Sequence, residues 1–145
     1  MNHVYREALV PYSAQQMYDL VNNTAEYPQF LPWCKHAHIL TQTEEQVTAT
    51  LLLAKSGIHK TFTTKNTLTP FELITIELVD GPFKHLQGQW RFNQQNLAHT
   101  LVALDLKFEF SSKILALLLG AVFNEVAQTL VSSFTQEAHR RYGAK

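Results

Sequence analysis

The chain of 145 residues is 46% hydrophobic and only 17% charged, which excludes a disordered chain and suits one domain with a sizeable core. Twelve Lys and Arg residues balance twelve Asp and Glu residues, so no net charge draws the whole protein to nucleic acid or to an anionic membrane. The single cysteine, Cys34, excludes an internal disulfide and a four-thiolate zinc site.

We expect no targeting or membrane-spanning segment in this sequence. Charged Arg6 and Glu7 lie where a signal peptide would have its apolar core. The longest apolar run, residues 114–123, is about half of the roughly twenty residues that span a bilayer. No repeat or linker marks a domain boundary. The sequence therefore predicts one domain over residues 1–145, located in the cytoplasm.

The first part of the chain predicts a strand followed by two helical segments. Residues 4–10 are a short candidate strand that Pro11 ends, and Ser13 and Gln16 then form a capping box that begins a helix. That helix ends near Asn22, and we expect Thr24 to cap a second, shorter helical turn.

Between residues 35 and 110 the hydrophobic period is two. Trp90 and Phe92, for example, alternate with Gln89 and Arg91, as expected for antiparallel strands with one face on a core. Turn residues at four places separate the strands: 56–57, 69–70, 80–82 and 94–96. The pattern predicts about six strands here, or seven with the first.

The last part of the chain predicts one long helix. Its apolar residues recur every three or four positions, namely Leu115, Leu119, Val122, Val126, Leu130, Phe134 and Ala138. Ser111 or Ser112 is the expected N-cap, and Gly143 follows the last helical residues. Because this helix is the only large partner for the apolar face of the sheet, the sheet should curl around it. A curled sheet is hard to fill with one helix, so we expect a cavity between them.

Several segments, taken together, are similar to those of the coenzyme Q-binding START-like family. They are residues 10–13, 27–34, 62–66, 80–83, 88–92 and 134–143, in the order and rough spacing of that family. The resemblance covers nearly the whole chain. It implies the α+β helix-grip fold, in which a curved antiparallel sheet of about seven strands holds a long C-terminal helix over a hydrophobic cavity.

The resemblance implies two activities. Some family members are carriers of the isoprenoid quinone (ubiquinone) used in respiration. The bacterial branch, which this chain resembles, includes a ribosome association toxin that binds the large ribosomal subunit and blocks subunit joining. The first hypothesis is thus a protein that binds an isoprenoid quinone or another lipid, in the cytoplasm or peripheral to the inner membrane. The second is an inhibitor of translation initiation, with an antitoxin as a further partner.

The candidate ligand-binding residues are large and apolar. Trp90 and Phe92 lie on the inward face of their strand, as core packing or as a cavity wall. Phe30 and Trp33 belong to a Pro-rich segment that either packs inward or forms a lid, and a lid would also suit transient contact with a membrane surface. Phe62 and three residues of the long helix complete the set: Val122, Val126 and Leu130.

Two basic clusters are candidates for contact with the ribosome or another anionic surface. Residues 46–71 hold no acidic residue but contain Lys55, Lys60 and Lys65. This is either a solvated face or a contact with ribosomal RNA. If His59 and Lys65 share a strand face, Lys60 must point the other way. One lysine could then reach the mouth of the cavity while the others meet ribosomal RNA phosphates.

The second basic cluster closes the long helix and contains His139, Arg140, Arg141 and Lys145. These cations suit the negative end of the helix dipole, and ribosomal RNA or anionic headgroups are the alternative partners.

Other features have plainer interpretations. We interpret Cys34 as a small buried hydrophobic residue, and His36 with His38 as two ligands that lack a third for a metal site. Residues 114–123 are more apolar than one buried face requires. Either both sides of the helix are covered there, or the helix end touches a membrane.

The sequence offers no catalytic set. Asp105 and Glu109 alternate with core residues and should face outward, so they are not an acid–base pair in the cavity. An enzyme resembling aromatases or cyclases is the third alternative. We expect a binding protein without enzymatic activity, cofactor or metal.

Overall fold

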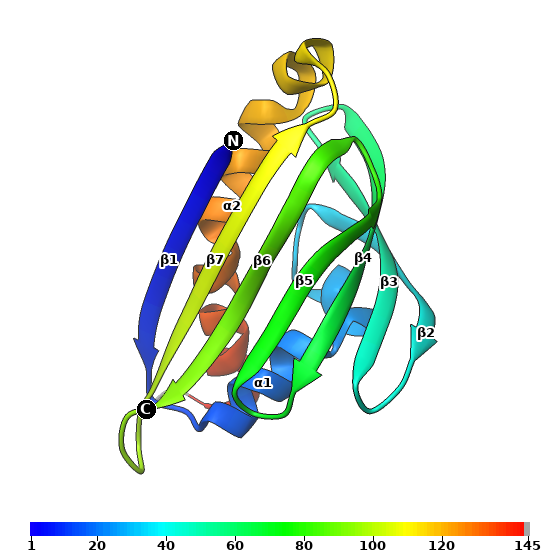
Figure 1. The fold of residues 1–145 in the computed structure, drawn as a ribbon. Coiled ribbons are helices and arrows are strands. Elements are labelled where there is room, and N and C mark those ends of the chain that lie inside the picture. Colours follow the sequence, from blue (N-terminus) through cyan, green and yellow to red (C-terminus); the bar gives the residue numbers. More distant parts are fainter. Residues whose placement is uncertain (144–145) are drawn as a thin grey trace.

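The computed structural model describes residues 1–143, in which a curved antiparallel sheet wraps around one long helix (Figure 1). The strands are β1 (Asn2–Val10), β2 (Cys34–Gln42), β3 (Gln46–Lys55), β4 (Ile58–Thr69), β5 (Leu73–Asp80), β6 (Phe83–Gln94) and β7 (Thr100–Phe110). The helices are α1 (Ala14–Asn22), the 3-10 helix η1 (Thr24–Gln29) and α2 (Lys113–Tyr142). The predicted α+β helix-grip architecture is confirmed.

The sheet has the strand order β1-β7-β6-β5-β4-β3-β2, and every pair is antiparallel. Strands β2 to β7 therefore form a continuous meander whose turns fall at the predicted places, with one further turn between β2 and β3. α1 and η1 carry the chain from β1 at one edge to β2 at the other (Figure 1). They lie across the end of the sheet at which α2 finishes.

The capping box at the start of α1 is present as predicted. The Ser13 hydroxyl accepts a hydrogen bond from the Gln16 backbone N–H at 3.0 Å, and the Gln16 side chain accepts one from the Ser13 N–H at 2.9 Å. These bonds satisfy donors that helix geometry would leave free. The prediction for Thr24 was wrong: Thr24 is the first residue of η1 and not its cap. Asn23 precedes η1 without a side-chain capping bond.

Close packing of the central strands depends on Gly88 in β6. A Cβ atom at this position would lie 2.4 Å from the carbonyl oxygen of Asp105 and 2.9 Å from the side chain of Leu106. Only a residue without a side chain fits there, so β6 and β7 approach each other closely at mid-strand. Bulges between Thr63 and Thr64, and between Phe83 and His85, add local bends that help the sheet to curl.

Helix α2 packs on the concave face of the sheet for most of its length. Ser112 caps it, with its hydroxyl accepting from the Leu115 N–H at 3.1 Å. From Leu119 to Ala138 one face of the helix is buried against β1, β7 and α1. By length and composition α2 could also cross a membrane. In this fold one face of it, from Leu119 to Ala138, belongs to the core.

The first turns of α2 decide against one of the two alternatives for residues 114–123, the coverage of both sides of the helix. Ile114, Leu117 and Leu118 are 70%, 85% and 61% exposed, so that alternative was wrong. In Figure 1 this part of the helix rises beyond the end of the sheet, where neither the strands nor α1 can reach it. The alternative, a helix end free to contact another surface, is considered below.

Candidate functional site

The candidate functional site is a cavity of about 90 Å³ between the concave face of the sheet and α2. Its wall is mostly apolar and comes from η1, the segment before β2, strands β3 to β7 and α2. The apolar wall includes Tyr27, Trp33, Leu51, Phe62, Ile76, Leu86, Trp90, Leu106, Phe123, Val126, Leu130 and Phe134. Three further residues, Thr24, Thr64 and Asn66, bring polar groups to the same wall.

Five of the eight sequence-predicted ligand residues line this cavity: Trp33, Phe62, Trp90, Val126 and Leu130. The structure brings them together from four separate segments of the chain. Four of them have an inward position on a strand or on the inner face of α2, which the hydrophobic period identifies, whereas Trp33 lies in the segment before β2.

The other three predicted ligand residues lie elsewhere. Phe92 is buried beside Tyr18 and Trp90 but is not part of the cavity wall. Phe30 packs on Tyr27 and Phe134 at the surface end of the Pro-rich segment. Val122 lines a smaller neighbouring pocket. The Pro-rich segment thus packs inward through its buried Leu31 and Trp33.

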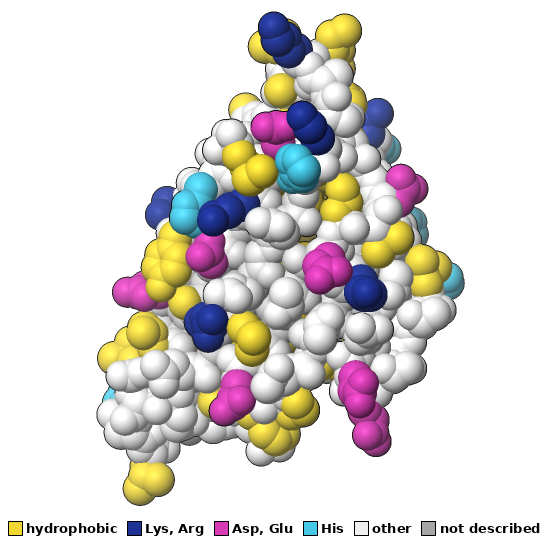
Figure 2. All heavy atoms as spheres, viewed as in Figure 1, with side chains coloured by type: hydrophobic (Ala, Val, Ile, Leu, Met, Phe, Trp, Pro, Cys, Tyr) yellow, Lys and Arg dark blue, Asp and Glu magenta, His cyan; other side chains and the backbone are white. Residues whose placement is uncertain are grey.

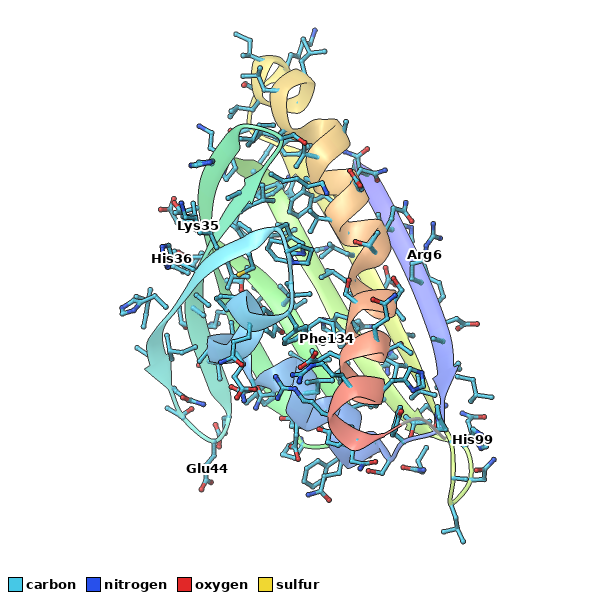
Figure 3. The ribbon with its side chains drawn as sticks, turned by 180° about the vertical axis from the view of Figure 1, so that it is seen from behind. Arg6, Lys35, His36, Glu44, His99 and Phe134 are labelled. Carbon is cyan, nitrogen blue, oxygen red and sulfur yellow. The ribbon has the colours of Figure 1, made fainter. Side chains whose placement is uncertain are left out.

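Several wall residues were not predicted, although the alternation of side chains along the strands could have identified them. Thr64 and Asn66 follow Phe62 at even spacing on β4, so they share its inward face. Both are polar, and a search for apolar positions passes over them. Phe134, by contrast, lay on the predicted apolar stripe of the helix. Figure 3 shows it on the side of α2 that faces the sheet, where its ring meets Trp90 edge-on at 5.3 Å between centroids.

A second pocket, of about 10 Å³, adjoins the cavity toward the start of α2. Phe62 and Phe123 line both spaces, with their rings edge-to-face at 6.2 Å between centroids. These two rings form the partition between the two pockets. Beyond them the smaller pocket is bounded by Lys60, Pro82, Leu119 and Val122, among others.

One buried polar atom of a residue in the cavity wall lacks a partner. The indole N–H of Trp33 is buried and donates to no acceptor within residues 1–143. Trp33 itself is only 7% exposed. A buried N–H that makes no hydrogen bond costs about 1–3 kcal/mol. Its presence beside a cavity indicates that a bound molecule could supply the acceptor.

Cys34 has the character of a buried apolar residue. It is 3% exposed, and its thiol donates weakly to the carbonyl oxygen of His36 at 3.5 Å. Burial raises the pKa of the Cys34 thiol to about 11. The thiolate needed for nucleophilic chemistry is therefore scarce near neutral pH.

The predicted lysine cluster is split between the two faces of the sheet. Lys55 is 3.5 Å from Glu125 on α2, and Lys60 lines the smaller pocket, so both face the helix. Lys65 lies on the opposite face of β4, 4.0 Å from Glu77 of β5. As predicted from the strand period, Lys60 and Lys65 point to opposite sides. The three lysines consequently do not form one continuous patch.

The arginines at the end of α2 are held in an ion-pair network. The guanidinium groups of Arg140 and Arg141 both donate to the buried carboxylate of Glu137, and Arg141 also donates to Glu26 of η1 at 2.5 Å. Because Arg140 and Arg141 donate to this carboxylate, the pKa of Glu137 is lowered. Arg141 also lies 5.5 Å from the centre of the Phe30 ring. Lys145, assigned to this cluster from the sequence, lies outside the described residues.

The remaining acidic and histidine side chains are dispersed. Asp105 is paired with His3 at 2.6 Å, and Glu109 with Lys84 at 3.7 Å, both away from the cavity. His36 points outward from β2 (Figure 3). Over residues 1–143 no group of three or more His, Cys, Asp or Glu side chains is arranged to hold a metal ion.

An apolar cavity between a curved antiparallel sheet and a long helix is the architecture of a START-like fold. The chain belongs to the polyketide cyclase/dehydrase and lipid transport family, whose model matches residues 10–135.

Its relatives within this family carry two kinds of name. The ribosome association toxin RatA of Vibrio cholerae is 48% identical over 143 residues, with 99% of both chains covered. The protein of the same name from Escherichia coli K12 is 47% identical, covering 100% of this chain and 92% of the relative. The mitochondrial coenzyme Q-binding protein COQ10 of Drosophila melanogaster is 29% identical, covering 95% of this chain and 59% of that protein.

Solved structures agree with the fold. The 18 kDa protein CC1736 of Caulobacter crescentus superposes with a TM-score of 0.77 at 27% identity, over 99% of this chain and 100% of that chain. The ZhuI aromatase/cyclase of Streptomyces gives a TM-score of 0.81 at 18% identity, over 97% and 95% of the two chains. The latter likeness concerns the fold alone. The named relatives are toxins and a binding protein, whereas enzymes occur among the fold neighbours.

Proposed function

We propose that this protein binds an isoprenoid quinone, or a lipid of similar chemistry, in the cavity between the sheet and α2. The observation that carries the proposal is the apolar cavity whose wall contains one buried and unpaired donor, the Trp33 indole N–H. Flat aromatic rings and branched aliphatic side chains suit a quinone ring and an isoprene chain. Similarity to a coenzyme Q-binding protein supports the same ligand class.

A carbonyl-bearing ligand fits this wall better than a plain hydrocarbon does. A hydrocarbon would leave the Trp33 N–H without an acceptor, whereas a quinone carbonyl oxygen could accept from it. The hydroxyl of Thr64 and the amide of Asn66, which lie 3.5 Å apart, are further hydrogen-bonding groups of the same wall.

The cavity must enlarge to take such a ligand. Sites for drug-sized molecules usually measure about 300–1,000 Å³, against the 90 Å³ found here. Rotation of the Phe62 and Phe123 rings would join the cavity to the smaller pocket and lengthen the space toward the start of α2. We therefore expect the ring of the quinone near Trp33 and its tail along α2.

The test is the quinone content of protein purified from its own host, measured by mass spectrometry of an organic extract. Affinity for a short-tailed ubiquinone should then be measured on Trp33→Phe, which keeps the aromatic ring and removes the N–H. We expect about a tenfold loss of affinity, equivalent to one hydrogen bond, with little change in Tm. Trp90→Phe is the matched control, because Trp90 also lines the cavity. Unchanged affinity in Trp33→Phe, or an empty protein that binds no added quinone, contradicts the proposal.

The second candidate function is association with the ribosome. It is favoured by the 47–48% identity to RatA proteins over essentially the whole chain. Such binding would use the outer surface, because the cavity is a space of only about 90 Å³ between the sheet and α2. Lysine side chains would contact ribosomal RNA phosphates, and the two activities would then occupy different surfaces of one molecule.

Sedimentation with ribosomal subunits in salt gradients tests the second function. Wild-type protein should travel with the large subunit, and Lys65→Gln, on the outer face of β4, should bind more weakly and with a shallower salt dependence. The matched control is Lys35→Gln, which removes an exposed lysine of β2. Equal loss in both variants would assign the effect to charge in general, and wild-type protein that stays free of subunits would refute ribosome binding.

A further inference from the structure

The first turns of α2 carry an apolar stripe on the side that does not face the protein. We call residues 113–121 the α2 tip. Ile114, Leu117 and Leu118 are spaced as neighbours on one helix face, Ala121 continues the row, and all four are exposed. Leu119 and Phe123 lie on the opposite face and are buried. The tip is thus apolar on both sides, and only the inner side is covered.

Cations accompany the exposed stripe. Lys113 opens the helix, and Lys60 of β4 lies beside Leu119 in the wall of the smaller pocket. Within residues 1–143 neither lysine has a carboxylate within 4.0 Å. In contrast, Lys84 and Lys55 at the same end are paired with Glu109 and Glu125.

The other charged or titratable groups at this end of the molecule are an aspartate, two histidines and the end of the α2 dipole. Asp80 is exposed and has no ion pair within residues 1–143. His59 and His85 are also exposed, close to the turns between β3 and β4 and between β5 and β6. The positive end of the α2 dipole lies at the same place. In Figure 2 the end at which α2 begins shows hydrophobic side chains and a cationic side chain together.

The α2 tip is also continuous with the cavity. Leu119 lies on the inner side of the tip and Val122 follows the tip directly; both line the smaller pocket, which the Phe62 and Phe123 rings separate from the main cavity. A hydrophobic molecule that arrives at the tip therefore has a short apolar path into the cavity, interrupted by two aromatic rings.

We propose that the α2 tip docks on the surface of an anionic lipid bilayer. Its protruding apolar side chains would enter the acyl boundary, while Lys113 and Lys60 meet the headgroups. The protruding shape suits a yielding planar surface, and the adjacent path explains why the contact lies at this end and not on the outer face of the sheet. The proposed partner is therefore a lipid surface. The docked protein exchanges its hydrophobic ligand with that surface, a step that rests on the ligand binding proposed above.

Vesicle flotation of the full chain tests this proposal without any quinone present. Wild-type protein should float with phosphatidylcholine vesicles that contain phosphatidylglycerol, and less with phosphatidylcholine alone. The double variant Leu117→Gln with Leu118→Gln should lose binding about tenfold or more, because each leucine contributes more than 1 kcal/mol on leaving water. The matched control is Leu40→Gln with Leu97→Gln, which removes two leucines that are 51% and 104% exposed elsewhere.

The electrostatic part has its own variant. Lys60→Gln with Lys113→Gln should lower binding to the anionic vesicles about tenfold and leave binding to neutral vesicles unchanged. Equal flotation of the tip and control variants overturns the proposal. So does a wild-type dimer in sedimentation equilibrium that the Leu117 and Leu118 variant converts to monomer, because the tip would then be a contact between two copies. Both leucine positions are exposed, so these variants are expected to fold.

Discussion

Truncation of Phe123 to alanine should both destabilise the protein and enlarge its ligand space. The ring is 6% exposed and lies in edge-to-face contact with four other phenylalanines. Its centroid is 4.8 Å from that of Phe108 and 4.9 Å from that of Phe83. Removal of a buried Phe side chain typically costs about 3–5 kcal/mol. For a chain of this size that corresponds to a fall in Tm of about 10 °C.

The same change should join the two pockets that Phe123 now separates. A short-tailed ubiquinone that fills the joined space would stabilise the folded state by mass action. We therefore expect added quinone to raise the Tm of Phe123→Ala by more than it raises that of the wild type, as measured by differential scanning fluorimetry. Phe123→Leu offers a milder version if the alanine variant does not fold.

Phe92→Ala is the matched control for this prediction. Phe92 is also a buried aromatic residue, 4% exposed, but it lines neither pocket. Its loss should lower the Tm by a similar amount without a larger response to quinone. If both alanine variants respond to quinone equally, Phe123 is not the partition, and the path from the α2 tip to the cavity is wrong.

Two further predictions follow from titratable groups. With its pKa raised from 9.0 to about 11, Cys34 should have about 100-fold fewer thiolates than a free cysteine near neutral pH. Ellman's reagent should label it only after denaturation, and rapid labelling of the native protein would contradict its burial. Because its folded pKa is lowered, Glu137 stabilises the fold above the ordinary glutamate pKa of about 4.3, and this contribution is lost as the pH falls through the folded value. Glu137→Gln should therefore lower the free energy of unfolding by about 2 kcal/mol at pH 7, and the difference from wild type should shrink as the pH falls. A difference independent of pH would show that the carboxylate charge is not responsible.

The sequence by itself determined the order and type of nearly every element. Alternation such as Trp90 and Phe92 against Gln89 and Arg91 reports which side of a strand meets water, and that is a local property. Capping by Ser13 and Ser112 is equally local, because each side chain bonds a backbone group three residues away. The architecture followed, since a sheet with one apolar face and a single long helix has few ways to bury both.

Only the tertiary structure decided which inward residues surround the cavity. Phe92 and Trp90 point to the same face of β6. Tyr18 of α1 packs against Phe92, whereas Trp90 lines the cavity and contacts Phe134. The alternation along a strand identifies the face on which a side chain lies. The distance from that side chain to the opposite element depends on how far the sheet curls. For the same reason the polar Thr64 and Asn66 became wall residues.

Tertiary structure also decided the character of the charged and apolar surfaces. The lysines of β3 and β4 read as one cluster along the chain, but strand alternation and the packing of α2 divide them between two faces and pair Lys55 with Glu125. Residues 114–123, at the start of α2, carry no polar side chain. Ile114, Leu117 and Leu118 are exposed because the sheet ends beside this part of the helix and no other element covers its outer face. Where one element stops relative to another depends on long-range packing, and no local pattern of residues records it.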